Sequence, residues 1–292
     1  VSGAIINNFT LSDVAVTGSG STAAVAGYAA GSASVFNDIT VAGGTVSGTS
    51  YVGGILGQGS ISGIKITNCI NKAKITGSSS YVGSIAGTMY GGEVADCGNE
   101  GAVSGTYQVG GIVGSNSSSY SITITRCRNN GTVKGNMSGT TESYGVGGII
   151  GTVYNASSAI SESFNTGSIS GIDEAKGVRS MGGIAGSVYT GGATVRDCYN
   201  TASVTNGYAS GYTGGVAGYI TSGTTNTLKN CYSAGTASGG TNGGVIGYIT
   251  TIPAAATDYL KNNYFAANGM QPAIGNVTTD IAGLAVGKTA DE

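Results

Sequence analysis

The stretch Tyr51–Gly57, with the sequence YVGGILG, decides the fold because versions of it recur along the chain. A weaker version, STAAVAG, begins at Ser21, and the later ones begin at Tyr81 (YVGSIAG), Gln108 (QVGGIVG), Gly145 (GVGGIIG), Ser180 (SMGGIAG), Tyr212 (YTGGVAG) and Thr241 (TNGGVIG). Their starts are 30, 30, 27, 37, 35, 32 and 29 residues apart. Eight copies at a period near 31 residues indicate a repeat architecture in which each unit packs against its neighbours.

A second motif follows each of the later copies, as in ITNCINKAKITG (66–77), ITRCRNNGTVKG (124–135) and VRDCYNTASVTN (195–206). Each unit therefore holds three short β-prone pieces bounded by Gly, Ser, Thr or Asn: the GGIVG piece, the piece before Cys, and the GTVxG piece. None has the period or the length of a helix. Three such strands predict one coil of a parallel β-helix, because a propeller blade needs four antiparallel strands and a longer unit.

The fold that we predict is therefore a single all-β domain, a parallel β-helix solenoid with three short strands per coil and about nine coils. Right-handed coils are expected from the general handedness of parallel strand crossovers. The solenoid is predicted to cover residues 1–267, with degenerate N-terminal coils over 1–50 and regular repeats over 51–267. Residues 268–292 leave the repeat and are interpreted as a C-terminal cap or a linker.

In-register stacking turns each column of the repeat alignment into a physical ladder. The Ile and Val column of the GGIVG piece is predicted to build the core. A second column consists of the cysteines Cys69, Cys97, Cys127, Cys198 and Cys231. We interpret them as small, buried, free thiols rather than as disulfides between neighbouring turns or as a thiolate metal site. Two residues later stands an asparagine column, predicted to satisfy backbone groups at a corner: Asn71, Asn99, Asn129, Asn165 and Asn200.

Tyrosine is unusually frequent, with 17 residues and no Trp. Aromatic residues follow the cysteine column at Phe164, Tyr199, Tyr232 and Tyr264. Others flank the GGIVG piece at Tyr51, Tyr81, Tyr154, Tyr189, Tyr212, Tyr219 and Tyr248. Stacked rings on a solenoid are most simply explained by packing, and the alternative is an exposed row that binds sugar rings or a protein partner.

Composition excludes several functions. The chain has no His, which removes Ser-His-Asp and Cys-His catalysis and imidazole metal sites. Charged residues make up 9% of the chain and the net charge is −2 without a basic run, so we expect no nucleic-acid partner. No apolar stretch approaches the roughly 18 residues of a membrane span, so no membrane insertion is expected. No metal and no cofactor are predicted.

The two longest spacings mark insertions at the same corner of adjacent coils, at 135–144 and 171–179. Stacking would bring the insertions together, and insertions on one face of a solenoid are where binding surfaces often form. The candidate binding residues are Glu142, Tyr144, Asp173, Glu174, Lys176 and Arg179. Solvated loops are the plainer interpretation, and a catalytic carboxylate pair is a third.

Outside the insertions, the densest acidic group is Glu93, Asp96 and Glu100, beside Arg126 and Arg128. Polysaccharide-cleaving β-helices need clustered carboxylates, or calcium with a basic residue. This group is better explained by ion pairs between coils, and the strand pieces offer mainly Gly, Ser, Thr and Ala. We therefore predict a protein without enzymatic activity, with a polysaccharide lyase or glycoside hydrolase as the alternative.

The motifs GG(I/V)xG and C-x-N-x-G-x-V-x-G resemble the GLUG-motif repeats of bacterial surface proteins over about residues 20–265. The resemblance implies a stacked β repeat, an extracellular location attached to the cell wall or cell surface, and no catalytic residue. It predicts an adhesive region that binds host or dietary glycans or a host surface protein, or else a stalk. In either case we expect a larger multidomain chain that supplies the anchor.

Overall fold

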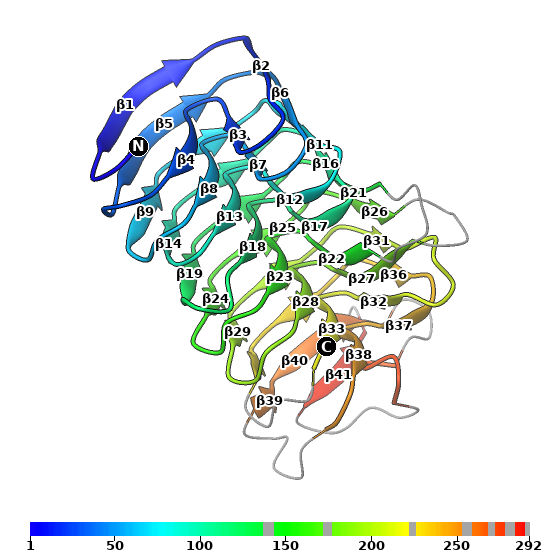
Figure 1. The fold of residues 1–292 in the computed structure, drawn as a ribbon. Helices are drawn as coiled ribbons and strands as arrows, with labels where there is room; N and C mark the ends of the chain where they lie inside the picture. The colour runs from blue at the N-terminus through cyan, green and yellow to red at the C-terminus, as the bar shows by residue number, and fades with distance from the viewer. Residues whose placement is uncertain are drawn as a thin grey trace.

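The computed structural model describes residues 1–136, 143–171, 177–221, 226–252, 259–267, 272–277 and 284–289. In this part of the chain every pairing between strands is parallel, and the chain winds into a β-solenoid with three strand regions per coil (Figure 1). The predicted fold class is confirmed. Three of the sheets contain eight strands each, which gives about eight full turns, and the fourth sheet extends beyond them at the C-terminal end.

Sheet A contains the piece before Cys and the residues that follow it. Its strands are β1 (Ile5–Leu11), β5 (Val35–Val41), β9 (Ile64–Thr67), β10 (Ile70–Asn71), β14 (Gly92–Ala95), β15 (Gly98–Asn99), β19 (Ile122–Thr125), β20 (Arg128–Asn129), β24 (Ala159–Ser161), β25 (Phe164–Asn165), β29 (Thr194–Arg196), β30 (Tyr199–Asn200), β34 (Thr227–Lys229), β35 (Tyr232–Ser233), β39 (Leu260–Lys261), β40 (Asn263–Ala266) and β41 (Ala285–Lys288). β41 pairs with β40, and Ile274 bridges to Ile246, so these parts of 268–292 pack on the last turn.

Sheet B is formed by the GTVxG piece. Its strands are β2 (Val14–Thr17), β6 (Gly44–Gly48), β11 (Lys74–Gly77), β16 (Val103–Gly105), β21 (Val133–Gly135), β26 (Ile169–Gly171), β31 (Val204–Thr205) and β36 (Ala237–Ser238). In β11, β16 and β21 the Val or Ile is buried and the residues on either side of it face outward, as expected for a sheet with one face on the core.

The GGIVG piece is bent in the middle, so that it supplies two sheets. Sheet C contains β3 (Thr22–Ala23), β7 (Val52–Gly53), β12 (Ser80–Gly83), β17 (Tyr107–Gly110), β22 (Ser143–Gly147), β27 (Val178–Gly182), β32 (Tyr212–Gly214) and β37 (Thr241–Gly243). Sheet D contains β4 (Ala26–Ala29), β8 (Leu56–Gly59), β13 (Ala86–Met89), β18 (Val113–Asn116), β23 (Ile150–Val153), β28 (Ala185–Val188), β33 (Ala217–Ile220) and β38 (Ile246–Ile249).

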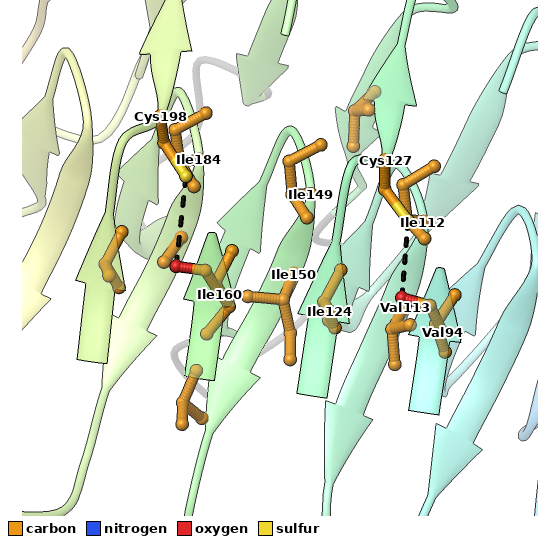
Figure 2. Packing of buried hydrophobic residues seen from close by; sticks show 14 of the residues in the cluster. Val94, Ile112, Val113, Ile124, Cys127, Ile149, Ile150, Ile160, Ile184 and Cys198 are labelled. Carbon is orange, nitrogen blue, oxygen red and sulfur yellow. Dashed lines mark hydrogen bonds between the residues drawn. The ribbon is translucent and has the colours of Figure 1, made fainter. Parts of the chain in front are cut away.

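The core runs the length of the solenoid as stacked aliphatic residues. Ile112, Ile149 and Ile184 occupy the same position in successive turns and are fully buried. Figure 2 shows them packed with residues of the neighbouring strands and with the side chains of Cys127 and Cys198. The described residues include no helix long and apolar enough to cross a membrane.

All five cysteines are buried and none forms a disulfide. Their thiols donate weak hydrogen bonds to backbone carbonyls of the preceding turn, including Cys127 Sγ to Val94 O at 3.5 Å and Cys198 Sγ to Ile160 O at 3.9 Å (Figure 2). Burial, with smaller contributions from the adjacent thiols, raises the pKa of Cys97 well above its ordinary value. Cys97 therefore acts as a small apolar side chain rather than as a nucleophile.

The asparagine column forms a continuous buried ladder. Asn99 Nδ2 donates to Asn129 Oδ1 at 2.6 Å, and Asn129 Nδ2 donates in turn to Asn165 Oδ1 at 2.6 Å. The same Nδ2 of each residue also donates to the carbonyl oxygen two residues further on, such as Gly131 O at 2.9 Å from Asn129. The amides thus satisfy the corner of every turn that they occupy.

The bend in the GGIVG piece points into the interior. A Cβ at Gly111 would lie 2.5 Å from Cγ of the fully buried Asn129, so a side chain there would collide with the asparagine ladder. In the preceding turn Ser84 replaces this glycine, and its hydroxyl accepts from Asn71 Nδ2 at 3.0 Å and donates to Asn99 Oδ1 at 2.7 Å. Because the bend is directed inward, the outer faces of sheets C and D turn toward each other.

Candidate functional site: a tyrosine-lined pocket between two sheets

The insertion residues predicted to bind a ligand are mostly not placed by the structure. Glu142, Asp173, Glu174 and Lys176 lie outside the described residues. Tyr144 lies on β22, where the backbone alone is described, and Arg179 lies on β27 and is half-buried. The two strands pair in register, which puts Tyr144 beside Arg179 in the next turn.

The acidic group on sheet A forms ion pairs between coils, as predicted. Two N–H groups of Arg126 donate to the two carboxylate oxygens of Asp96 at 2.7 and 2.8 Å, and this contact lowers the pKa of Asp96. The other pairs are Lys65–Glu93 at 3.7 Å, Lys72–Glu100 at 2.9 Å and Arg128–Glu100 at 3.9 Å. Among the described residues, no group of three His, Cys, Asp or Glu side chains is arranged to hold a metal ion.

The bend between sheets C and D creates a pocket on the outer surface. Its volume is about 280 Å³, near the lower end of the range for small-ligand sites. Four tyrosines line it, Tyr51 and Tyr81 from the sheet C side, and Tyr90 and Tyr154 just beyond the strands of sheet D. The remaining lining residues carry hydroxyl or amide groups: Thr88, Ser115, Asn116, Ser117 and Ser118.

Tyr51 and Tyr81 form one aromatic wall of the pocket. Their rings are stacked in successive turns, with centroids 4.9 Å apart and planes 5° from parallel. Both residues have positive φ angles, 54° for Tyr51 and 64° for Tyr81, as does Gln108 in the next turn at 46°. This left-handed conformation is unfavourable for bulky residues, and such strain tends to be found at functional sites.

The polar side of the pocket is fixed by a hydrogen-bond network. Gln108 Nε2 donates to the Tyr154 hydroxyl at 3.0 Å, and the backbone N–H of Tyr154 donates to Asn116 Oδ1 at 2.7 Å. Asn116 Nδ2 donates to the Ser158 hydroxyl at 3.0 Å. Both polar atoms of this buried amide therefore have a partner, which fixes its orientation. Thr88 Oγ1 donates to the carbonyl oxygen of Ser115 at 3.0 Å. These internal hydrogen bonds hold the polar side of the pocket in one arrangement, and such preorganisation reduces the entropy that binding would cost.

Aromatic contacts continue from the pocket toward the C-terminal turns. Tyr154 stacks on Tyr189 at 5.8 Å, and Tyr189 contacts Tyr219 at 5.4 Å. Tyr219 stacks in turn on Tyr212 at 5.5 Å and on Tyr248 at 6.0 Å. We call these five residues the tyrosine row. It extends the aromatic surface of the pocket over the following turns of sheets C and D.

The electrostatics of this surface favour neutral phenols. Burial raises the pKa of Tyr81, and the neighbouring phenols of Tyr51 and Tyr90 add to the shift. Burial also raises the pKa of Tyr219, and this effect is larger than the lowering caused by the positive charge of Arg179. The hydroxyls of Tyr81 and Tyr219 therefore remain protonated at neutral pH and can donate hydrogen bonds.

The sequence identified the tyrosines of this surface except Tyr90, but not their polar partners. Gln108 and Asn116 bear no signal of their own in a chain rich in polar residues. Gln108 takes the place that Tyr51 and Tyr81 hold in earlier copies of the motif, and this departure was the available sign. Neither a protein-family model nor a curated protein sequence matches the chain. The chemistry of the pocket is therefore the basis for assigning a function.

Proposed function

We propose that this chain is a carbohydrate-binding region, without enzymatic activity, of a bacterial surface protein, and that it adheres to glycans through the tyrosine-lined pocket. The surface location and the membership of a larger chain rest on the resemblance of the repeat to GLUG-motif repeats. The glycan-binding role rests on the chemistry of the pocket itself.

The observation that carries the proposal is the lining of the pocket, four tyrosines with five hydroxyl or amide side chains. Sugars present apolar C–H faces together with hydroxyl groups, and an aromatic ring with a polar tip suits both. The lining residues include no carboxylate, lysine or arginine, so a neutral sugar is the ligand that they match. Without a carboxylate the pocket also lacks the acid–base pair that glycoside hydrolysis requires.

The test is a screen of the purified chain against neutral host and dietary glycans, with released reducing sugar measured in the same wells. Tyr81→Ala removes one of the two stacked rings of the aromatic wall. Aromatic contacts contribute about 0.5–1.5 kcal/mol, so binding should weaken by roughly three- to tenfold. Tyr28→Ala is the matched control, because Tyr28 is 48% exposed and does not line the pocket.

Three other results would each redirect the assignment. Sugar release would make the chain an enzyme and direct attention to its carboxylates. Loss of binding when residues 137–142 and 172–176 are removed, with Tyr81→Ala unaffected, would locate the site at the insertions. No binding to any glycan would favour the stalk, for which the regular stacking of eight turns is already suitable.

A further inference from the structure

Sheet A carries a second aromatic surface, separate from the pocket between sheets C and D. The outward-facing residue after each cysteine position is aromatic in four successive turns, and the four residues pair in register: Phe164, Tyr199, Tyr232 and Tyr264. The rings of Phe164 and Tyr199 lie 4.9 Å apart and those of Tyr199 and Tyr232 lie 5.3 Å apart, nearly parallel in both cases. Tyr232 is 43% exposed and Tyr264 is 39% exposed.

A pocket of about 380 Å³ opens at the C-terminal end of this aromatic surface. It is lined by Tyr232 and Tyr264 from adjacent turns, with Asn230, Cys231 and Asn262. The two amides are oriented by neighbours in the preceding turns, since Asn262 Nδ2 donates to Asn230 Oδ1 at 3.2 Å and Asn230 Nδ2 donates to Asp197 Oδ1 at 2.9 Å. The pocket therefore offers two aromatic rings and fixed polar groups within one opening.

Positive charge is concentrated beside this pocket. Arg196, Lys229 and Lys261 form one column in successive turns, and the two lysines directly precede the amides of the pocket. Lys288 lies over the Tyr264 ring, with its Nζ 5.9 Å from the ring centroid. In a chain with 12 Lys and Arg residues in total, four lie in this small part of sheet A.

These cations differ from those of the earlier turns on the same sheet. There each cation has a carboxylate partner: Lys65, Lys72, Arg126 and Arg128. In the C-terminal turns Arg196 pairs with Asp197, whereas Lys229 and Lys261 form no ion pair with any described residue. The ammonium groups of the two lysines are therefore available to an external anion.

We propose that this part of sheet A binds an acidic polysaccharide, a sugar chain bearing carboxylate or sulfate groups, with one sugar between Tyr232 and Tyr264 and its anionic groups on Lys229 and Lys261. Successive turns are about 4.8 Å apart, so a chain lying along the solenoid axis can present a charge to each lysine in turn. The aromatic rings would contact the sugar, and the lysines would select the charge. This site is independent of the neutral-glycan pocket proposed above.

The experiment measures binding of a galacturonic acid hexasaccharide to the full chain by calorimetry at low and moderate salt. The probes for comparison are its methyl ester, which has the same sugars without charge, a sulfated neutral hexasaccharide, and a single-stranded oligonucleotide of equal charge. The variants are Lys229→Gln, Lys261→Gln and Tyr232→Ala. Lys134→Gln is the control, because it removes the same charge from an exposed position on β21 of sheet B.

We expect the acidic hexasaccharide, the sulfated one or both to bind, and the methyl ester to bind at least tenfold more weakly. Each lysine variant should weaken binding by up to about fivefold, as the loss of an exposed ion pair does, and Lys134→Gln should leave it unchanged. Equal binding of the ester, an equal loss in Lys134→Gln, or no binding of either anionic sugar would overturn the proposal. Tighter binding of the oligonucleotide would also overturn it, in favour of a nucleic-acid partner. Neutral glycans bound at the other pocket would be unaffected by the lysine variants.

Discussion

At the scale of single residues, the asparagine ladder shows how one side-chain type can hold a repeat together. Each amide in the middle of the ladder both accepts from the turn before and donates to the turn after. The first member has no such neighbour, because Asn71 pairs with Val41 of the preceding turn, and its Oδ1 is buried without a partner. The ladder therefore stabilises interior turns more than terminal ones.

The first prediction concerns Asn129. Replacing it by alanine removes a donor and an acceptor from a buried chain and leaves Gly131 O and Asn165 Oδ1 without their partner. Unsatisfied buried groups cost about 1–3 kcal/mol each, so Asn129→Ala should lower the free energy of unfolding by roughly 2–4 kcal/mol in urea titrations. Asn130→Ala, next to it and exposed, is the control and should cost less than about 1 kcal/mol. Equal losses would show that the ladder adds nothing to stability.

At the scale of elements, the inward bend between sheets C and D is the feature on which the candidate pocket depends. In the turn of Gly111 it leaves no space for a side chain beside the asparagine ladder. A Cβ at Gly111 would lie 2.0 Å from the carbonyl oxygen of Gly148 as well as 2.5 Å from Asn129 Cγ. The backbone of Gly148 lies on one side and the hydrogen-bonded amide of Asn129 on the other, so neither can move away from an added side chain.

The second prediction follows from this crowding. Gly111→Ala should lower the free energy of unfolding by about 3 kcal/mol, as overpacking of a tight site does. Gly111→Ser should recover part of the loss, because Ser84 occupies the equivalent position and bridges two asparagines there. Gly43→Ala, where the nearest atom to a new Cβ is 3.9 Å away, should change stability by less than about 0.5 kcal/mol. A serine variant no better than alanine would contradict the bridging role.

At the scale of the whole molecule, the solenoid separates its two proposed binding surfaces along its axis. The tyrosine-lined pocket uses residues of Tyr51–Tyr154, and the pocket on sheet A lies between Asn230 and Tyr264. Each turn contacts its neighbours in a repeated register, so stability is close to a sum of local terms. A turn can therefore be removed without disturbing distant ones.

The third prediction uses this modularity. Deleting residues 212–240 joins Gly211 to Thr241, whose position matches that of Tyr212 in the register. The shortened chain should fold with the same β-sheet circular dichroism per residue and keep the neutral-glycan pocket. Binding of the acidic hexasaccharide should weaken, because the deletion removes Lys229 and Tyr232 and leaves Lys261 as the one lysine of the column. Loss of both binding activities in a folded chain would mean that the surfaces are not independent. Failure to fold would contradict the additive description of the turns.

The repeat period in the sequence determined the stacking along the solenoid axis. In-register stacking places equivalent residues above one another, so the cysteine and asparagine ladders, the aliphatic core and the ion pairs of Asp96 could be predicted from an alignment of the copies. This is possible because contacts between turns join positions that are equivalent in sequence.

The arrangement around each turn was decided by the tertiary structure. That YVGGILG bends inward, and that the outer faces of sheets C and D share one pocket, depends on how the interior space between the asparagine ladder and the glycine backbone is filled. Gln108 and Asn116 lie near Tyr154 for the same reason. Such contacts join positions that no period relates, and packing alone determines them.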